Sequence, residues 1–187
     1  MKSGDNLSLK ILLTGRPGIG KTTALLKIVE MCKRDGYRVG GMITREVRKR
    51  TRIGFEIEDL ATGERGTLAS IYAPMGPRVG KYRVVLEDLN RVGAGAIERA
   101  LRYADVVFID EIGPMELYSR RFKEAVEAAF LSSKPLVGTI HIRASRYPFA
   151  RGILERFRPE VYELTLQNRE SVPSIVYRKL KSVLEEK

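Results

Sequence analysis

The chain has 187 residues, which suffices for one domain with a substantial hydrophobic core. Apolar residues make up 43% of it, and no run approaches the roughly twenty that span a membrane. The first residues, Met1–Asp5, lack the apolar region of an export signal. Cys32 is the only cysteine, which excludes disulfides and cysteine-based metal sites within one chain. We therefore expect one cytoplasmic domain over residues 1–187, with no membrane partner.

The net charge is +11, with 34 basic against 23 acidic residues. This balance permits a nucleic-acid partner but does not favour one, because the sequence shows no long basic run and no aromatic-rich basic segment. Solubility and attraction of nucleotides explain the charge more simply. Charged residues make up 30%, and Gln167 is the only glutamine, a composition that suggests a thermophilic source.

The first elements surround a phosphate-binding motif. Residues 9–14 read as a buried strand, 22–33 read as a helix, and Gly36 suits the end of that helix. Between strand and helix lies the pattern G-x-x-x-x-G-K-[ST], whose backbone N–H groups can surround phosphates. We expect nucleotide binding by Gly15, Arg16, Pro17, Gly18, Ile19, Gly20, Lys21, Thr22 and Thr23. Lys21 would reach the terminal phosphates as a catalytic cation, and the Thr22 hydroxyl would bind magnesium.

The middle of the chain predicts antiparallel strands. Residues 38–48, 53–60 and 67–72 read as strands joined by turns at 49–52 and 61–66. Residues 73–80 form a loop rich in glycine and proline, and 81–85 read as another short strand. The basic turn at 49–52 is best explained as a solvated turn, and a nucleic-acid contact there is the less favoured alternative.

The second half alternates helices and apolar strands. We expect helices at 86–103, 116–132, 147–157 and 168–186, and strands at 104–110, 135–141 and 160–166. Apolar strands separated by helices predict a mainly parallel sheet covered on both faces, an α/β fold with added antiparallel strands. Ligands of such sheets bind beyond the carboxyl ends of the strands.

Two adjacent acids follow the apolar strand at 104–110. Asp110 occupies the position expected of a magnesium-binding acid opposite Thr22. Glu111 would orient or deprotonate the attacking water, because a carboxylate within hydrogen-bond reach can act as general base. Kinases of this fold need no such group, so a second acid here favours hydrolysis.

Further residues follow predicted strands. His141, the only histidine, could sense the terminal phosphate or serve a structural role. Arg143, Arg146 and Arg151 are candidates for neutralising charge in the transition state, and an arginine from a second subunit is an equal alternative. Asn168 lies where the nucleotide base commonly binds, but we expect it to cap the last helix.

The motifs together resemble a known family. They are Gly15–Thr22, Gly54–Ile57, Val79–Tyr82, Asp110–Leu117, Thr139–His141 and Asn168–Arg169, in this order over nearly the whole chain. The chain resembles the THEP-type nucleoside-triphosphatases, whose animal members are called cancer-related nucleoside-triphosphatase. The resemblance implies a three-layer, RecA-like P-loop fold. It also implies slow, Mg²⁺-dependent hydrolysis of ATP, GTP, CTP and UTP to diphosphate and phosphate.

The resemblance carries over the phosphate loop, Asp110 and Glu111 directly. It also implies roles for Lys81, Tyr82, Glu116, His141 and Asn168. Two other hypotheses stay open, a small nucleotide or nucleoside kinase and a nucleotide-dependent nucleic-acid-binding ATPase. The sequence leaves the base preference and the oligomeric state undetermined.

Overall fold

The computed structural model describes residues 8–186. The residues Met1–Asp5, for which the sequence predicts no export signal, lie outside the described residues. Within the described part, one nine-stranded sheet runs in the order β5-β6-β4-β3-β2-β7-β8-β1-β9. No helix formed by residues 8–186 has the length and apolar character needed to cross a bilayer.

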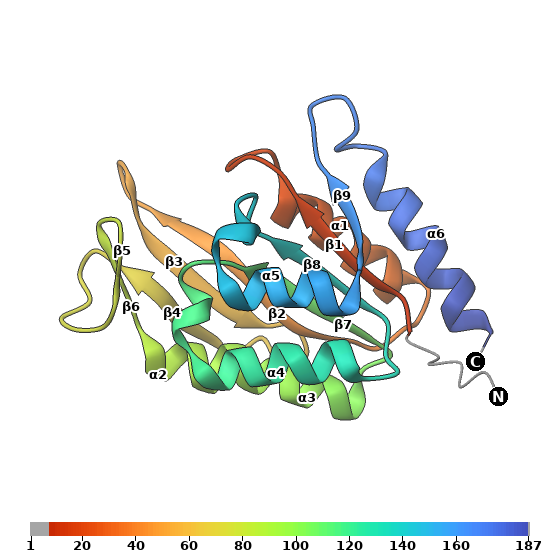
Figure 1. Cartoon of the computed structure of the whole chain (residues 1–187), viewed down its shortest axis with the longest axis horizontal. Coiled ribbons are helices and arrows are strands. Elements are labelled where there is room, and N and C mark those ends of the chain that lie inside the picture. Colours follow the sequence, from red (N-terminus) through yellow and green to blue (C-terminus); the bar gives the residue numbers. More distant parts are fainter. Residues whose placement is uncertain (1–7, 187) are drawn as a thin grey trace.

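One half of the sheet is parallel. It contains β1 (Lys10–Thr14), β2 (Val39–Arg48), β7 (Val106–Ile112), β8 (Leu136–Ile140) and β9 (Glu160–Glu163). Strand β8 lies between β1 and β7. The carboxyl ends of these strands therefore share one edge, the upper edge in Figure 1.

The other half is antiparallel and continues from β2. It contains β3 (Arg52–Asp59), β4 (Arg65–Ser70), β5 (Arg78–Val79) and β6 (Tyr82–Val84). The sequence placed a loop over residues 73–80, but Arg78 and Val79 pair with β6 because the hairpin turns tightly at Gly80, with φ of 59°. The predicted fold class, a mainly parallel sheet with added antiparallel strands, is confirmed.

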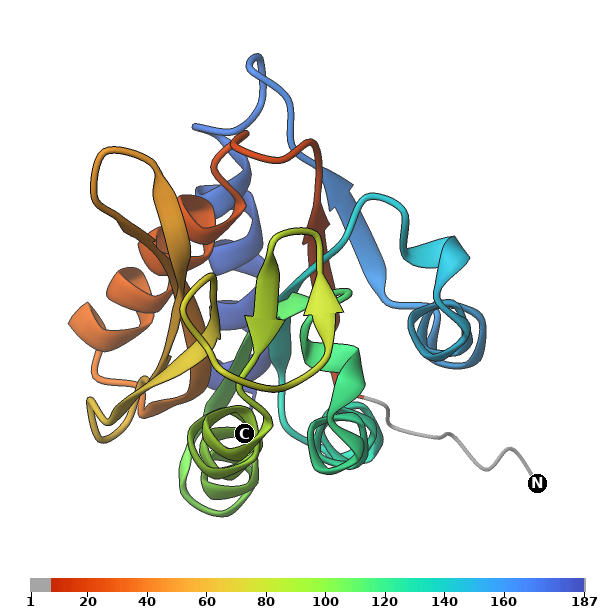
Figure 2. The same cartoon turned by 90° about the vertical axis from the view of Figure 1, so that its left-hand side faces the viewer.

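Helices cover both faces (Figure 2). On one face lie α1 (Lys21–Arg34) and α6 (Val172–Glu185), and on the other lie α3 (Gly95–Tyr103), α4 (Arg120–Leu131) and α5 (Pro148–Phe157). Successive residues of a strand point to opposite faces, so both cores draw on the same strands. In β7, Val106 and Phe108 pack towards α1, whereas Val107 and Ile109 pack towards α3 and α4.

The structure corrects several helix boundaries. The segment predicted as one helix over 86–103 comprises α2 (Leu86–Asp88), a π-helical stretch (Leu89–Ala94) and α3. The helix predicted from 116 begins as a separate 3₁₀ turn (Glu116–Tyr118), because the Ser119 hydroxyl accepts a hydrogen bond from the Phe122 N–H and starts α4 there. Another 3₁₀ turn, Ala144–Arg146, precedes α5.

Candidate active site

The loop between β1 and α1 has a backbone that requires glycine. Gly15, Gly18 and Gly20 have φ values of 147°, 79° and 104°. A Cβ on Gly15 would also lie 3.0 Å from the carbonyl oxygen of Leu164. Glycine alone adopts these angles without strain, so the loop keeps a compact turn that other residues would distort.

The amino end of α1 is open towards this loop. Gly20 is its N-cap and offers no side-chain acceptor, and the first turn contains no acidic residue. The first N–H groups of a helix lack partners within the helix and carry the positive end of its dipole. This end of α1 can therefore bind an anion, and Lys21, its first residue, adds a cation whose Nζ donates to the Gly15 carbonyl at 3.0 Å.

Asp110, near the end of β7, is the centre of the polar network. Its Oδ2 accepts from the Thr22 hydroxyl at 2.8 Å and from the Thr44 amide at 3.2 Å, and its Oδ1 accepts from the Thr139 hydroxyl at 2.8 Å. The side chain is almost wholly buried. Burial raises the pKa of this carboxyl, while the hydrogen bonds from the three threonines oppose that rise.

The donor set at Asp110 fits magnesium. Mg²⁺ prefers oxygen ligands and is usually held by one or two protein groups together with phosphates and water. The Thr22 hydroxyl and the Asp110 carboxylate supply such oxygens beside the phosphate loop. Residues 8–186 contain no cluster of three histidine, cysteine or acidic side chains that could bind a metal independently of a nucleotide.

Glu111 and Glu116 lie next to Asp110. The pKa of Glu111 is raised, chiefly by burial. The charge of nearby Lys21 opposes this rise, and the charge of Asp110 adds to it. Glu116 is buried, with 3% of its surface exposed. Its pKa is raised well above the ordinary value, first by burial and then by the charge of Glu111. A Cβ on Gly113 would meet Glu111 Cγ at 2.9 Å, so glycine leaves room for this carboxylate.

His141 follows β8, at the same edge of the sheet. Its Nδ1 accepts a hydrogen bond from the Arg143 amide at 3.1 Å, and its ring packs edge-on against Tyr147. Burial lowers the pKa of His141, and the charges of Lys21 and Arg143 lower it further. A neutral ring is therefore favoured, with its proton on Nε2 because Nδ1 accepts. The Arg143 side chain is exposed.

The loop after β9 packs beside the phosphate loop. The Arg169 guanidinium donates to the Ile19 carbonyl at 3.4 Å. The sequence predicted that Asn168 caps the last helix, and this prediction is wrong, because Ser171 is the N-cap of α6. Its amide instead holds the loop, accepting from the Thr165 N–H at 2.7 Å and donating to the Glu163 carbonyl at 2.9 Å. The preceding strand accordingly ends at Glu163 rather than at 166.

Sequence reasoning missed Thr44 and assigned no role to Thr139. Thr139 lies directly opposite Asp110 in the β7–β8 ladder. Both threonines donate to Asp110. A buried carboxylate needs donors, so a search for threonines near the ends of neighbouring parallel strands could have found them. Lys81 and Tyr82 lie instead on the antiparallel half, where the Tyr82 hydroxyl accepts from Arg52.

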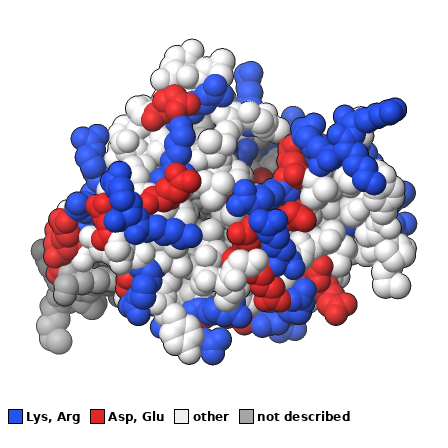
Figure 3. All heavy atoms as spheres, turned by 180° about the vertical axis from the view of Figure 1, so that it is seen from behind, with Lys and Arg blue, Asp and Glu red and all other residues white. Residues whose placement is uncertain are grey.

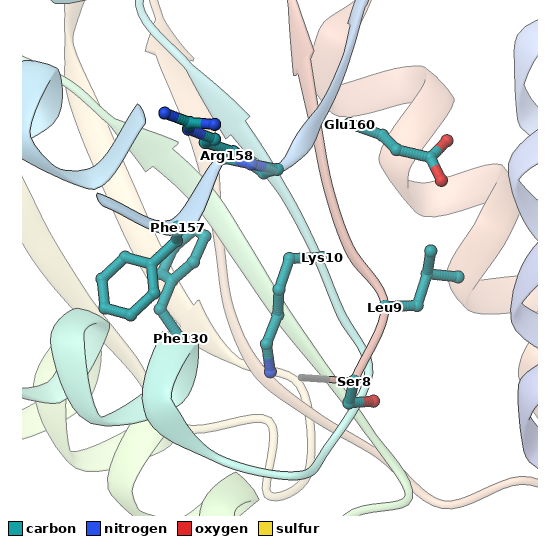
Figure 4. A pocket seen from close by; sticks show the side chains of 8 residues that line it. Ser8, Leu9, Lys10, Phe130, Phe157, Arg158 and Glu160 are labelled. Atoms are coloured by element: carbon teal, nitrogen blue, oxygen red, sulfur yellow. The ribbon is translucent and has the colours of Figure 1, made fainter. Parts of the chain in front are cut away.

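A separate cavity of about 250 Å³ lies at the start of β1 (Figure 4). Phe130, Phe157 and Arg158 line it together with Lys10. The Lys10 ammonium donates to the carbonyls of Ala129, Ser132 and Lys134, at 3.0, 2.8 and 2.6 Å. Lys10 thus binds the carboxyl end of α4. The cavity lies at the end of β1 opposite the phosphate loop.

Comparison with known proteins identifies the family to which the chain is similar. A family model described as NTPase matches residues 10–177. The nucleoside-triphosphatase THEP1 of Thermofilum pendens is 53% identical over 174 residues, covering 92% of this chain and 96% of the relative. The same-named protein of Methanocaldococcus jannaschii is 44% identical over 176 residues, covering 92% and 97%.

Two solved structures are similar in fold. The crystal structure of THEP1 from the hyperthermophile Aquifex aeolicus superimposes with a TM-score of 0.80 and 32% identity, covering 92% of this chain and 99% of that one. The solution structure of a human cancer-related nucleoside triphosphatase gives a TM-score of 0.77 and 33% identity, covering 94% and 98%.

Proposed function

The chain belongs to the THEP-type nucleoside-triphosphatase family, as its sequence motifs indicated, and from this we propose that it hydrolyses nucleoside triphosphates to diphosphate and phosphate. The observation that supports this most directly is the contact of 2.8 Å between the Thr22 hydroxyl and Asp110, with Glu111 next in sequence. It brings the phosphate loop, a metal-binding acid and a second acid to one point.

Phosphate binding would use the loop and α1. The backbone N–H groups around Gly18 and Gly20 and the open helix end would hold the β- and γ-phosphates. Lys21 would exchange its hydrogen bond to the Gly15 carbonyl for the phosphate oxygens. The reaction would be an in-line attack of water on the γ-phosphorus, with catalysis from positioning and charge neutralisation.

We propose Thr22 and Asp110 as the residues that hold Mg²⁺. Bound there, the ion would neutralise charge on the β- and γ-phosphate oxygens. Thr44 donates its amide and its hydroxyl to Asp110 Oδ2, and Thr139 donates its hydroxyl to Oδ1, so the two threonines would fix the rotamer of Asp110. Removal of such supporting groups typically costs about 10- to 100-fold in metal affinity or activity.

Glu111 would orient and deprotonate the attacking water. The raised pKa of its buried carboxyl makes it a stronger base than an exposed glutamate. His141, whose pKa is lowered, is neutral near pH 7 and could donate a hydrogen bond from Nε2 to the terminal phosphate. Arg143 is exposed on the same side and remains a candidate arginine within this chain.

Broad base tolerance is consistent with the loop after β9. The Asn168 amide accepts from the Thr165 N–H and donates to the Glu163 carbonyl, so these bonds hold the loop and orient the side chain towards it. Leu166, in the same loop, is 68% exposed. An apolar side chain packs against any base without distinguishing its edges, which supports ATP, GTP, CTP and UTP as substrates.

We propose that residues 1–187 act as one domain, because the residues of the site come from β1, β2, β7 and β8 of a single sheet. A cytoplasmic location is proposed on the composition, since the one cysteine is buried and unpaired, as suits a reducing compartment.

The test is phosphate release from the four nucleoside triphosphates at elevated temperature, with and without Mg²⁺. Wild type is compared with Glu111→Gln and with Glu124→Gln, an exposed acid of α4. Expected are Mg²⁺-dependent turnover of all four, its loss in Glu111→Gln with nucleotide affinity retained, and no change in Glu124→Gln. Unchanged turnover in Glu111→Gln would contradict the assignment of Glu111 as the general base. Transfer of the phosphoryl group to an added nucleoside or monophosphate, without hydrolysis, would indicate a kinase.

A further inference from the structure

Two loops of the antiparallel half form one basic surface, here called the hairpin surface. The β2–β3 turn, residues 48–52, contains four basic residues and no acid. Residues 71–83, which lead through the β5–β6 hairpin, contain three basic residues and no acid. The hairpin surface comprises Arg48, Lys49, Arg50, Arg52, Tyr72 and Lys81, which lie in these two loops and around the Tyr82 ring.

Side-chain and backbone contacts join the two loops. The Lys49 ammonium lies 5.7 Å from the centre of the Tyr72 ring, and the Arg52 Nε donates to the Tyr82 hydroxyl at 2.9 Å. The Ile71 N–H donates to the Ile53 carbonyl at 2.9 Å. Figure 3 shows basic side chains gathered over the hairpin tip at the upper right, whereas blue and red side chains alternate over much of the rest of that face.

The charge on this surface is only partly neutralised. Arg48 and Arg52 share one carboxylate, that of Glu46, at 2.7 and 2.9 Å. No carboxylate of residues 8–186 pairs with Lys49, Arg50 or Lys81. These cations are therefore available to an anionic ligand.

The surface also offers an exposed ring. Tyr72 is 65% exposed and Met75, three residues on, is 76% exposed. Aromatic rings among basic side chains are typical of single-strand binding, because every unpaired base has a face that can stack and the backbone phosphates meet the cations. The bases of a duplex are already stacked, so a duplex would gain only the charge contacts.

We propose that the hairpin surface binds single-stranded nucleic acid, with Tyr72 stacking on a base and the surrounding arginines and lysines contacting phosphates. The proposal goes beyond hydrolysis of free nucleotides. The β2–β3 turn lies at the same edge of the sheet as the phosphate loop. Strand β2 leads from Thr44, whose N–H donates to Asp110, to Arg48 at its carboxyl end. Four residues of strand span only about 13 Å.

The experiment measures the binding of labelled oligo-U and oligo-dT strands, each of about 20 nucleotides, to the wild-type protein by fluorescence anisotropy. The salt concentration is varied from about 50 to about 200 mM, the range over which binding through phosphate contacts weakens steeply. Tyr72→Ala should weaken binding about tenfold, the loss expected for one stacked base. Arg50→Ala should lower the slope of log K against log salt by about 0.7. A preference for U over dT would mark RNA as the ligand.

Matched controls separate stacking from general charge. Tyr103 is also 65% exposed and also lies near an arginine, Arg102, but it is on α3. Tyr103→Ala and Arg120→Ala, the latter on α4, should leave strand binding unchanged. Absence of binding at 50 mM salt would overturn the proposal. Equal losses for Tyr72→Ala and Tyr103→Ala would also overturn it. So would an affinity for heparin, or for a duplex of the same length, that equals the affinity for the single strand. Phosphate release without a strand, measured in parallel, reports on the proposed hydrolysis separately.

Discussion

The Thr22 hydroxyl donates to Asp110 Oδ2 at 2.8 Å, although 88 residues separate the two in sequence. Thr22 belongs to the first turn of α1 and Asp110 to β7, and β8 lies between β7 and the strand that precedes Thr22. The contact therefore spans the central part of the sheet. It sets the distance between the phosphate loop and the acid before any ligand binds.

Replacing Thr22 with valine removes the hydroxyl and keeps the shape. We expect Mg²⁺-dependent turnover to fall more than about tenfold, with a higher Mg²⁺ concentration needed for half-maximal rate, because a group beside the metal is lost. Steady-state phosphate release over a Mg²⁺ titration measures both effects. Thr62→Val, in the exposed turn after β3, is the control and should behave as wild type. An unaltered Mg²⁺ titration in Thr22→Val would contradict the assigned metal site.

Glu116 makes stability depend on pH. Its pKa in the folded protein is raised by burial and by the charge of Glu111. Folding therefore favours the protonated form, and this contribution is lost as pH rises through the folded-state pKa. Glu116→Gln, which is neutral throughout, should be more stable than wild type above the pKa of an unfolded glutamate, about 4.3. The difference in Tm should widen towards alkaline pH and vanish below pH 4. A difference that stays constant with pH would show that Glu116 ionises freely.

Much of this site could be predicted because its motif is local. The phosphate loop is a continuous stretch, and Asp110 ends an apolar strand, so each is visible without tertiary contacts. Thr44 was missed because its role depends on the neighbouring β7, which lies some 60 residues further along the chain. Asn168 was misassigned because an asparagine that closes a loop and one that caps a helix give the same local pattern.

The fold was predictable in class but not in detail. Alternation and apolar runs gave the strands, whereas the short β5 carries no periodic signal over two residues. The 3₁₀ turn Glu116–Tyr118 was read as part of α4, which begins only after Ser119, whose hydroxyl accepts from the Phe122 N–H. The π-helical stretch packs closely on β3, since a Cβ on Gly93 would lie 2.6 Å from Ile57 Cδ1, a tertiary contact that the local sequence does not reveal.

Gly41 in β2 should tolerate no side chain. Its φ is 110°, and a Cβ would lie 1.9 Å from the carbonyl oxygen of Phe108 in β7. We expect Gly41→Ala to lower the free energy of unfolding by about 3 kcal/mol or more, since backbone strain and overpacking add. Gly63→Ala is the matched control, because Gly63 has φ of 75° but no atom within 4 Å of its Cβ position. It should cost about 1 kcal/mol. Chemical denaturation distinguishes them, and similar losses in both variants would contradict the close approach of β2 to β7.

Cys32 should report on unfolding. It lies in α1 facing the core, and burial, followed by the charge of Asp35, raises the pKa of its thiol to about 12. At pH 8 the thiolate fraction would be only ~10⁻⁴, against roughly a quarter for an exposed thiol. Labelling by a disulfide reagent should therefore be slow in the native protein and immediate in denaturant. An exposed thiol made by Thr62→Cys in a Cys32→Ala background should label at once in both. Fast labelling of native Cys32 would mean that α1, and with it the phosphate loop, opens far more often than the buried core around it implies.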